Sequence, residues 1–465
     1  MNTPLLPLLS LLVACTNGDK AADSGGTDSG GEASITCADV DRTNCVLIEA
    51  GDSQGLLDAA NLLEDDSAIV LAEGTWTLDN AVTFRSVTGI TLIGQGMGRS
   101  VLDFGGVANQ VNGVDVVVDD FHIEGLTILD AAKDGLRIED SSDIVIRGVE
   151  ATWTNENDSA NGAYGLYPVQ VQRVLMEDNV ASNAADAGIY VGQCQHAIVR
   201  NNTASGNVAG LEIENTQFAD VYGNTVVDNT AGLVVFDLPG NPVIGRDIHI
   251  HDNVVSDNNR ANFAPGGTVA QIPAGTGTFV LASRRVVITG NTYARNNSTD
   301  IAVLSGFVVE GDPAQWYTPT EDVVGDVTDL DLVSDDAGVY NYRTVDVWAY
   351  GNTHEGSGTE ADLSSLDERP MGFLLGIMYG AETIDTVLYD AIGESAFHVS
   401  DAALNSNDNR VCVGSDAGVT FASLNLEVLS QEDFPQLSMI YRPDAPFAPF
   451  DCTGVEVISP DLEGR

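Results

Sequence analysis

A repeat with a period of about 22 residues in the middle of the chain is the feature that most constrains its fold. Four segments begin with glycine and continue with alternating apolar residues: 165–169, 188–191, 210–214 and 232–236. The glycines that open them are Gly165, Gly188, Gly210 and Gly232, so the spacing is nearly constant. A fixed period of this length indicates a solenoid, in which each turn buries its apolar face by stacking on its neighbours. The repeat therefore predicts an all-β solenoid with one coil per repeat.

Alternation within the repeat sorts its residues into inward and outward positions. The first and third residues after each glycine are apolar and are predicted to point inward: Leu166, Ile189, Val191, Leu211, Ile213, Leu233 and Val235. A second predicted inward column is formed by Val199, Val221 and Ile250. Asparagines recur three residues after that column, and they predict a structural ladder of amides that bond to one another: Asn179, Asn202, Asn224, Asn253 and Asn291.

The segment 1–34 has the pattern of an export signal followed by a tether. The apolar stretch 5–14 is too short to span a membrane and ends in Leu12-Val13-Ala14-Cys15, which resembles a bacterial lipobox. No lysine or arginine precedes this stretch, so only the α-amino group supplies the positive charge. We predict a lipoprotein signal peptide at 1–14, lipidation of Cys15, and a flexible Gly/Ser/Asp/Thr-rich tether at 15–34. The residue after Cys15 is threonine rather than aspartate, which predicts an outer-membrane lipoprotein, on the periplasmic or the cell-surface side.

The remaining cysteines fit an exported protein, since disulfides form in oxidising compartments. Cys37 and Cys45 are close enough in sequence to pair, while Cys412 and Cys452 flank the C-terminal region. We expect disulfides among these four residues. Cys194 is left over inside a repeat and is interpreted as a small buried apolar thiol rather than a nucleophile.

The charge of the chain limits its partners. The 69 acidic and 19 basic residues give a formal net charge of −50. Such a surface repels nucleic acid, because binding would add like charge instead of releasing counterions. It is compatible with Ca²⁺, which prefers oxygen ligands. An acidic surface is equally explained by solubility alone.

Outside the repeat, the sequence predicts a capping helix and a closing region. Residues 53–64 have the pattern of a short amphipathic helix with Ser53 as its N-cap, followed by strands at 68–71, 90–93 and 114–118. A helix there would cover the open edge of the first coil. The predicted boundaries are a β-helix at 35–411 and a disulfide-bearing cap at 412–465. Long excursions are expected near 155–163, 237–246, 260–275 and 310–340, where function tends to lie on a solenoid.

Several runs resemble the bacterial parallel β-helix repeat-containing proteins. The similarity extends from about residue 50 to 455 and is carried by 69–75, 90–96, 188–193, 210–215, 235–239, 262–265 and 269–277. The resemblance implies a single-stranded right-handed parallel β-helix that is exported or lipidated. It also implies a c-type cytochrome-like protein as a candidate partner, because such a protein is often encoded beside members of this family. The activity of the family is not established.

One outward face combines aromatic rings with carboxylates. Its candidate substrate-binding residues are Arg137, Tyr167, Asp186 and Tyr190, and its candidate catalytic residues are Glu212, Glu214 and Asp237. Glu212 and Glu214 are two residues apart on one predicted strand, so their β-carbons should lie about 6.5–7 Å apart on the same side. Such a pair suits glycoside hydrolysis or a Ca²⁺ site between coils, and the tyrosines could stack on sugar rings.

The function of this face has three interpretations in the sequence. The first is recognition of an acidic or neutral polysaccharide. The second is a polysaccharide lyase, epimerase or hydrolase at the same face, although basic residues there are scarce and Arg137 is one of few. The third is a non-enzymatic scaffold. The alternative without a site is that the carboxylates are solvated charges and the tyrosines cover apolar surface.

A second place where chemistry could occur is the pair His249 and His251, which point the same way on a predicted strand and could bind a metal. No third ligand is near them in the sequence. They are therefore interpreted as surface histidines.

Overall fold

The structure is a computed structural model that describes residues 34–462 except 108, 395–405, 425 and 427–439. The predicted signal peptide, the lipidation site Cys15 and the tether up to residue 33 lie outside the described residues. By its contacts the chain separates into residues 1–34 and a compact unit from Ile35 onward. No helix among the described residues is long and apolar enough to cross a membrane.

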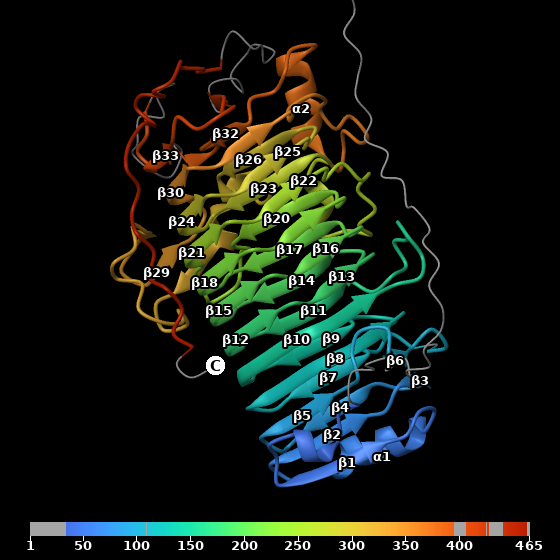
Figure 1. The fold of residues 1–465 in the computed structure, drawn as a ribbon. Helices are drawn as coiled ribbons and strands as arrows, with labels where there is room; N and C mark the ends of the chain where they lie inside the picture. The colour runs from blue at the N-terminus through green and yellow to red at the C-terminus, as the bar shows by residue number, and fades with distance from the viewer. Residues whose placement is uncertain (1–33, 108, 395–405, 425, 427–439, 463–465) are drawn as a thin grey trace, which may run out of the picture. The chain divides into compact units, whose positions relative to one another are not determined.

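The compact unit is a parallel β-helix whose strands pair with the equivalent strands of neighbouring coils (Figure 1). One face of each coil contributes to an 11-stranded sheet. Its strands, in chain order, are β4 (Val82–Arg85), β7 (Val114–Val117), β9 (Leu136–Glu139), β11 (Tyr164–Val169), β14 (Ala187–Gly192), β17 (Ala209–Glu214), β20 (Ala231–Phe236), β23 (Thr276–Leu281), β26 (Thr299–Leu304), β32 (Val387–Asp390) and β34 (Phe421–Ser423).

The other two faces are joined into a 20-stranded sheet. Its strands are β1 (Asn44–Ile48), β2 (Ser67–Leu71), β3 (Gly74–Thr77), β5 (Ile90–Ile93), β6 (Ser100–Asp103), β8 (Phe121–Leu129), β10 (Ser142–Thr152), β12 (Gln172–Glu177), β13 (Val180–Ser182), β15 (Gln195–Arg200), β16 (Thr203–Ser205), β18 (Gln217–Tyr222), β19 (Thr225–Val227), β21 (Arg246–His251), β22 (Val254–Ser256), β24 (Arg284–Thr289), β25 (Thr292–Ala294), β30 (Val345–Tyr350), β31 (Thr353–Glu355) and β33 (Val411–Val413).

The two faces of this sheet are joined because β10 pairs with β12 through its first half and with β13 through its second half. Gly148, which lies between the halves, has φ +57°, a conformation that glycine adopts without strain. The predicted strands at 68–71, 90–93 and 114–118 correspond to β2, β5 and β7. β33 and β34 extend the sheets beyond residue 411, inside the segment predicted as a C-terminal cap.

The interior is packed as the alternation predicts. All seven inward residues that follow the repeat glycines belong to one buried core, and so do Val199, Val221 and Ile250. The asparagine ladder is also confirmed. Each Nδ2 donates to the Oδ1 of the next asparagine at 2.9–3.0 Å, and the ladder continues from Asn291 to Asn352.

A second buried ladder, absent from the sequence interpretation, runs beside the first and links Asn207, Asn229, Asn258 and Asn296. Each of its members follows one member of the first ladder by five residues. That shared spacing was the signal in the sequence.

Helix α1 (Ser53–Leu62) occupies the segment predicted as a helix and packs beside β4, the first strand of the 11-stranded sheet. The prediction that Ser53 is the N-cap was wrong, because the N-cap is Asp52. The Asp52 carboxylate accepts the Gly55 amide at 2.9 Å, whereas the Ser53 hydroxyl donates to the Thr77 carbonyl at 2.7 Å. A carboxylate at the N-cap accepts a hydrogen bond from a free amide of the first turn. Its negative charge also interacts favourably with the positive end of the helix dipole.

The remaining elements lie before the first strand, in the case of η1, and in the excursions. The 3₁₀ helices are η1 (Cys37–Asp39), η2 (Val269–Gln271), η3 (Gly306–Val308) and η4 (Pro313–Trp316). The excursion after β26 also holds a small antiparallel sheet of β27 (Tyr317–Pro319), β28 (Val333–Ser334) and β29 (Gly338–Tyr340). Helix α2 (Pro370–Tyr379), absent from the sequence interpretation, packs Leu375 and Met378 against Leu388 and Leu424 near the C-terminal end of the stack.

Two disulfides join Cys37 to Cys45 and Cys412 to Cys452, as expected. Cys194 is a free, fully buried thiol within the core. Burial raises the pKa of this thiol to about 12, so it is not a nucleophile at neutral pH.

Candidate functional site

The outward face of the 11-stranded sheet is covered from β14 to β26, whereas the outward residues of β4, β7 and β9 and the tyrosines of β11 are partly or fully exposed. Every residue of β14, β17, β20, β23 and β26 is buried, including the outward ones. An apolar layer lies on this face, in which Phe236 and Phe279 of the sheet pack with Ile272 and Trp316 from the excursions. The predicted direction of the outward residues holds, but the excursions fold over them.

Three tyrosines form a compact aromatic group, the tyrosine cluster, on this face. The ring centroids of Tyr164, Tyr167 and Tyr190 lie 4.5–4.7 Å from one another. Tyr190 is buried, whereas Tyr164 and Tyr167 are partly exposed. The Tyr190 ring lies over Gly192, where a β-carbon would approach it to 2.1 Å. Glycine at this position therefore allows the ring to lie flat along its own strand.

Next to the tyrosine cluster lie Asp186, Glu212 and Glu214, which we call the carboxylate cluster. Glu212 and Glu214 are 1% and 8% exposed. The alternative interpretation, in which these carboxylates are solvated surface charges, is therefore wrong for these two residues. Glu212 is in register with Tyr190 across the β14–β17 pair. Asp186 immediately precedes β14 and is partly exposed.

The carboxylate cluster is linked to an excursion and to the tyrosines. The Asn241 Nδ2 donates to Glu214 Oε1 at 3.1 Å, which ties the excursion after β20 to the site. The Tyr190 hydroxyl favours the charged form of Glu214, and the Tyr164 hydroxyl favours that of Asp186. Glu212 Oε2 and Asp186 Oδ1 are buried atoms with no hydrogen-bond partner among the described residues.

Burial and mutual repulsion keep the carboxylate cluster protonated well above the ordinary range. Burial and then the nearby Asp186 and Glu214 charges raise the pKa of Glu212 well above its ordinary value. Burial raises the pKa of Glu214 to about 7, although hydrogen bonds from Tyr190 and Asn241 oppose the rise. Burial and the Glu214 charge raise the pKa of Asp186 to about 7. Carboxyl groups that change protonation near neutrality can act as general acids or bases.

These pKa values predict that the protein becomes less stable as the pH rises toward neutrality. In the unfolded chain Asp186 and Glu214 lose their protons near their ordinary values of 3.8 and 4.5, whereas the folded protein holds them to about pH 7. The folded state therefore binds more protons in this window. Each group stays protonated over about two pH units at about 1.4 kcal/mol per unit, so the free energy of unfolding should fall by about 5 kcal/mol between pH 5 and pH 8. Urea denaturation at several pH values measures this change. A constant or rising free energy of unfolding from pH 5 to pH 8 would contradict it.

A fourth carboxylate near the tyrosines, Asp134, was not among the sequence candidates. It is 1% exposed and lies two residues before β9, at the register position that Tyr164 and Ala187 occupy in the following coils. Burial raises its pKa to about 6, and the Lys133 ammonium, 3.8 Å away, opposes the rise. Asp134 also raises the pKa of Tyr167, after burial itself.

Arg137 lies beside this group, as predicted, in register with Tyr167. Its guanidinium is already paired, because Nε lies 3.0 Å from Asp115 Oδ1 and Nη2 lies 2.9 Å from Glu139 Oε2. It is partly exposed, with 21% of its side-chain surface accessible. Arg137 can therefore offer only part of its hydrogen-bonding capacity to a ligand.

Asp237 lies close enough to the carboxylate cluster for its charge to contribute to the raised pKa of Glu214. Its Oδ2 accepts hydrogen bonds from the Gly245 amide and Asn341 Nδ2, both at 2.6 Å, and its Oδ1 accepts one from the Ser283 hydroxyl at 3.2 Å. Asp237 is fully buried. We therefore assign Asp237 a positioning role, in which it fixes the excursion that carries Asn241 over Glu214.

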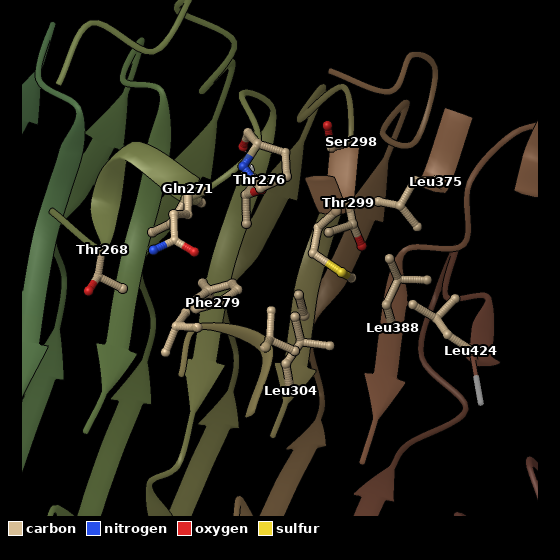
Figure 2. Close-up of a pocket in the computed structure, with 16 residues that line it drawn as sticks. Thr268, Gln271, Thr276, Phe279, Ser298, Thr299, Leu304, Leu375, Leu388 and Leu424 are labelled. Carbon is tan, nitrogen blue, oxygen red and sulfur yellow. Dashed lines mark hydrogen bonds between the residues drawn. The ribbon is translucent and has the colours of Figure 1, made fainter. Parts of the chain in front are cut away.

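A separate apolar cavity lies further along the same face, between the sheet and helix α2 (Figure 2). Phe279 and Leu304 line it from the sheet, Thr268 and Gln271 from the excursion after β22, and Leu375 from α2. Its volume of about 30 Å³ holds no more than one or two water molecules. It is too small for a sugar ring and is interpreted as imperfect packing.

Comparison with known proteins agrees with this architecture. Residues 107–269 match the family described as "Right handed beta helix region". This match and the parallel sheets identify the protein as a right-handed parallel β-helix, and they confirm the resemblance to parallel β-helix repeat proteins. No curated protein sequence matches the chain.

Solved structures with a similar course of the chain include three polysaccharide-acting proteins. The A-module of the Azotobacter vinelandii mannuronan C-5 epimerase AlgE4 is 16% identical, with 72% of this chain and 88% of that chain covered and a TM-score of 0.41. The periplasmic alginate epimerase AlgG is 12% identical, with 69% and 81% covered and a TM-score of 0.35. The catalytic domain of a GH87 alpha-1,3-glucanase is 13% identical, with 82% and 56% covered and a TM-score of 0.43.

Proposed function

We propose that the protein binds a polysaccharide in the cell envelope, and that the tyrosine and carboxylate clusters form the binding site. The observation that carries this proposal is the juxtaposition of three packed tyrosine rings with Asp186, Glu212 and Glu214 on one face of the β-helix. Aromatic faces suit the apolar faces of sugar rings, and carboxyl groups accept hydrogen bonds from sugar hydroxyls. The partly exposed Tyr164 and Tyr167 mark the edge at which a glycan would enter.

The protonation of the site supports a reaction as well as binding. Burial raises the pKa of Glu214 to about 7 and that of Glu212 well above its ordinary value, so one carboxyl of this pair can donate a proton while its neighbour accepts one. The second candidate function is therefore acid–base chemistry on the bound polysaccharide, as a lyase, epimerase or hydrolase.

The charge of the site bears on the substrate. The carboxylate cluster holds no basic side chain, and the neighbouring Arg137 is paired with Asp115 and Glu139. A neutral polysaccharide therefore fits the site directly. A polyuronate would fit when Ca²⁺ bridges the two sets of carboxylates, or when the cluster is protonated.

The proposed location is the outer membrane, through a lipid on Cys15, and it rests on the sequence pattern around that residue. A scaffold that docks a c-type cytochrome-like protein is the remaining alternative. It requires no buried carboxylates, so the two proposals differ in whether Glu212 and Glu214 matter for binding.

A glycan-array screen of the purified protein tests the proposal, run once with Ca²⁺ and once with a chelator. We expect binding to one class of polysaccharide. Binding in both conditions would indicate a neutral glycan, and binding only with Ca²⁺ would indicate a polyuronate. Absence of binding in both conditions would contradict the proposal and favour the scaffold, which a pull-down with periplasmic proteins would then test.

A further inference from the structure

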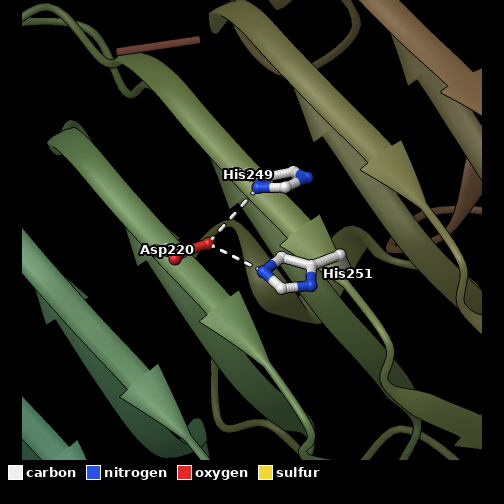
Figure 3. A group of neighbouring side chains, drawn as sticks. All are labelled: Asp220, His249 and His251. Carbon is white, nitrogen blue, oxygen red and sulfur yellow. Dashed lines mark hydrogen bonds and ion pairs between the residues drawn. The ribbon is translucent and has the colours of Figure 1, made fainter. Parts of the chain in front are cut away.

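Two histidines and an aspartate converge on a different face of the β-helix, on the 20-stranded sheet (Figure 3). His249 and His251 alternate along β21 and therefore point to the same side. Asp220 lies opposite His249 on the neighbouring strand β18. The third ligand that the local sequence lacked thus comes from the preceding coil.

The three side chains are close enough to share one ion. Asp220 Oδ1 lies 3.4 Å from His249 Nδ1 and 3.0 Å from His251 Nε2. One ligand atom from each residue lies within 4.8 Å of the other two, and among the described residues this is the single group of three His, Cys, Asp or Glu side chains that meets this criterion. A tetrahedral ion with ligands at about 2.0–2.1 Å holds them about 3.3 Å apart, so small side-chain rotations would complete the site.

A neutral His251 ring cannot donate a hydrogen bond to both of the carboxylates that face it. Its Nδ1 lies 2.8 Å from Asp252 Oδ2, and its Nε2 lies 3.0 Å from Asp220 Oδ1. Both partners are carboxylates, which only accept hydrogen bonds, whereas a neutral imidazole has one N–H to donate. Either a second proton or a metal ion must therefore lie between His251 and Asp220.

The surroundings favour a metal ligand role for His251. An Nδ1–H that donates to Asp252 leaves the Nε2 lone pair directed at Asp220. A carboxylate that fixes the outer nitrogen of a histidine is the usual support of a metal-bound imidazole. The His251 ring stacks on the rings of Tyr222 and His249, with centroid distances of 4.8 Å and 4.2 Å. This stacking further restricts the rotation of His251. All three candidate ligands are partly exposed, so an ion could enter and water could complete its coordination.

We propose that Asp220, His249 and His251 bind a divalent transition metal of the Zn²⁺ or Cu²⁺ type, with Asp252 as the residue that orients His251. Two imidazole nitrogens and one carboxylate oxygen suit such ions better than Ca²⁺ or Mg²⁺, which prefer oxygen ligands throughout. The site lies on another sheet from the carboxylate cluster and does not depend on the proposed polysaccharide function.

The test uses the complete chain without an affinity tag. Calorimetric titration with Zn²⁺ at pH 7.5 should give one site per chain, and a Cu²⁺-loaded sample should show electron paramagnetic resonance couplings from two imidazole nitrogens. His249→Gln and His251→Gln should each weaken binding at least about tenfold, and Asp252→Asn about tenfold. Circular dichroism checks that the variants remain folded.

His122→Gln is the matched control, because His122 is also a partly exposed histidine of this sheet and lies 2.8 Å from the Glu124 carboxylate, but has no role in the proposed site. This variant should bind Zn²⁺ as the parent protein does. Equal Zn²⁺ binding by the parent and the His249→Gln/His251→Gln double variant would overturn the proposal, since the ion would then bind elsewhere on the acidic surface. Absence of Zn²⁺ binding, or a Cu²⁺ spectrum without two nitrogen couplings, would also overturn it and leave a protonated histidine paired with Asp220.

Discussion

The double substitution Glu212→Gln/Glu214→Gln is expected to reduce polysaccharide binding or turnover at least about 100-fold while the protein stays folded. Glutamine keeps the size and most hydrogen bonds of each side chain but cannot exchange a proton. Loss of a general acid and base typically lowers a rate by about 10²–10⁴-fold. The measurement is affinity for, or turnover of, the glycan that the array identifies.

A measurement of stability shows whether the double variant loses binding because the site is changed or because the protein is misfolded. The parent protein keeps two buried carboxyls with raised pKa values, which destabilises the folded state above neutral pH. The double variant should therefore unfold at an equal or higher urea concentration than the parent at pH 8. It should also show a smaller fall in stability between pH 5 and pH 8. Unchanged glycan binding by this folded variant would falsify the assignment of the two glutamates.

A matched control is Glu355→Gln/Glu360→Gln, which removes two exposed glutamates outside the two clusters. The control removes two full negative charges, at least as many as the site variant removes, because Glu212 and Glu214 are largely protonated near neutral pH. Binding that falls equally in the two would indicate a general electrostatic effect instead of a site. We expect the control variant to bind like the parent.

The second large effect is expected inside the solenoid, where Asn224→Leu should lower the free energy of unfolding by about 3–5 kcal/mol. Asn224 Oδ1 accepts the Asn202 amide and Asn202 Nδ2, both at 2.9 Å, and its Nδ2 donates to the Val199 carbonyl at 3.0 Å. Leucine has a similar volume but leaves these buried groups unpaired. Each unpaired buried group costs about 1–3 kcal/mol.

Urea denaturation of Asn224→Leu measures this loss, with Asn155→Ala as the control. Asn155 is exposed in the excursion after β10 and lies outside both ladders, so its replacement should change stability by less than about 0.5 kcal/mol. A loss of under about 1 kcal/mol for Asn224→Leu would mean that the ladder contributes little. If Asn224→Leu does not fold, Asn224→Ser offers a smaller change of the same kind, since its hydroxyl can still donate and accept one bond.

These two predictions concern buried polar groups that differ in whether their hydrogen bonds are satisfied. The asparagines are neutral, lie inside the coil and bond to equivalent residues above and below them, so every buried amide has a partner. The carboxyls lie outside the coil under the excursions, and Glu212 Oε2 has no partner among the described residues. Satisfied buried groups stabilise a fold, whereas unsatisfied buried acids indicate a group kept for another reason.

The sequence by itself determined the solenoid and its interior. Its period set the coil length, and the alternation after each glycine set the inward residues, because both depend only on the geometry of stacked strands. The ladder from Asn179 to Asn291 was predictable for the same reason, and the ladder from Asn207 to Asn296 was equally available from its identical spacing. The disulfides followed from the few cysteines and their positions.

Only the tertiary structure decided what lies on the outside of the coils. Glu212 and Glu214 point outward as the alternation predicts, but the excursions that bury them have no repeat from which their path could be inferred. The same irregular segments surround Asp237 with hydrogen-bond donors and bring Asn241 onto Glu214. Asp220 meets His249 because one coil lies directly on the next, and this contact depends on the register between strands, which a local pattern in the sequence does not contain.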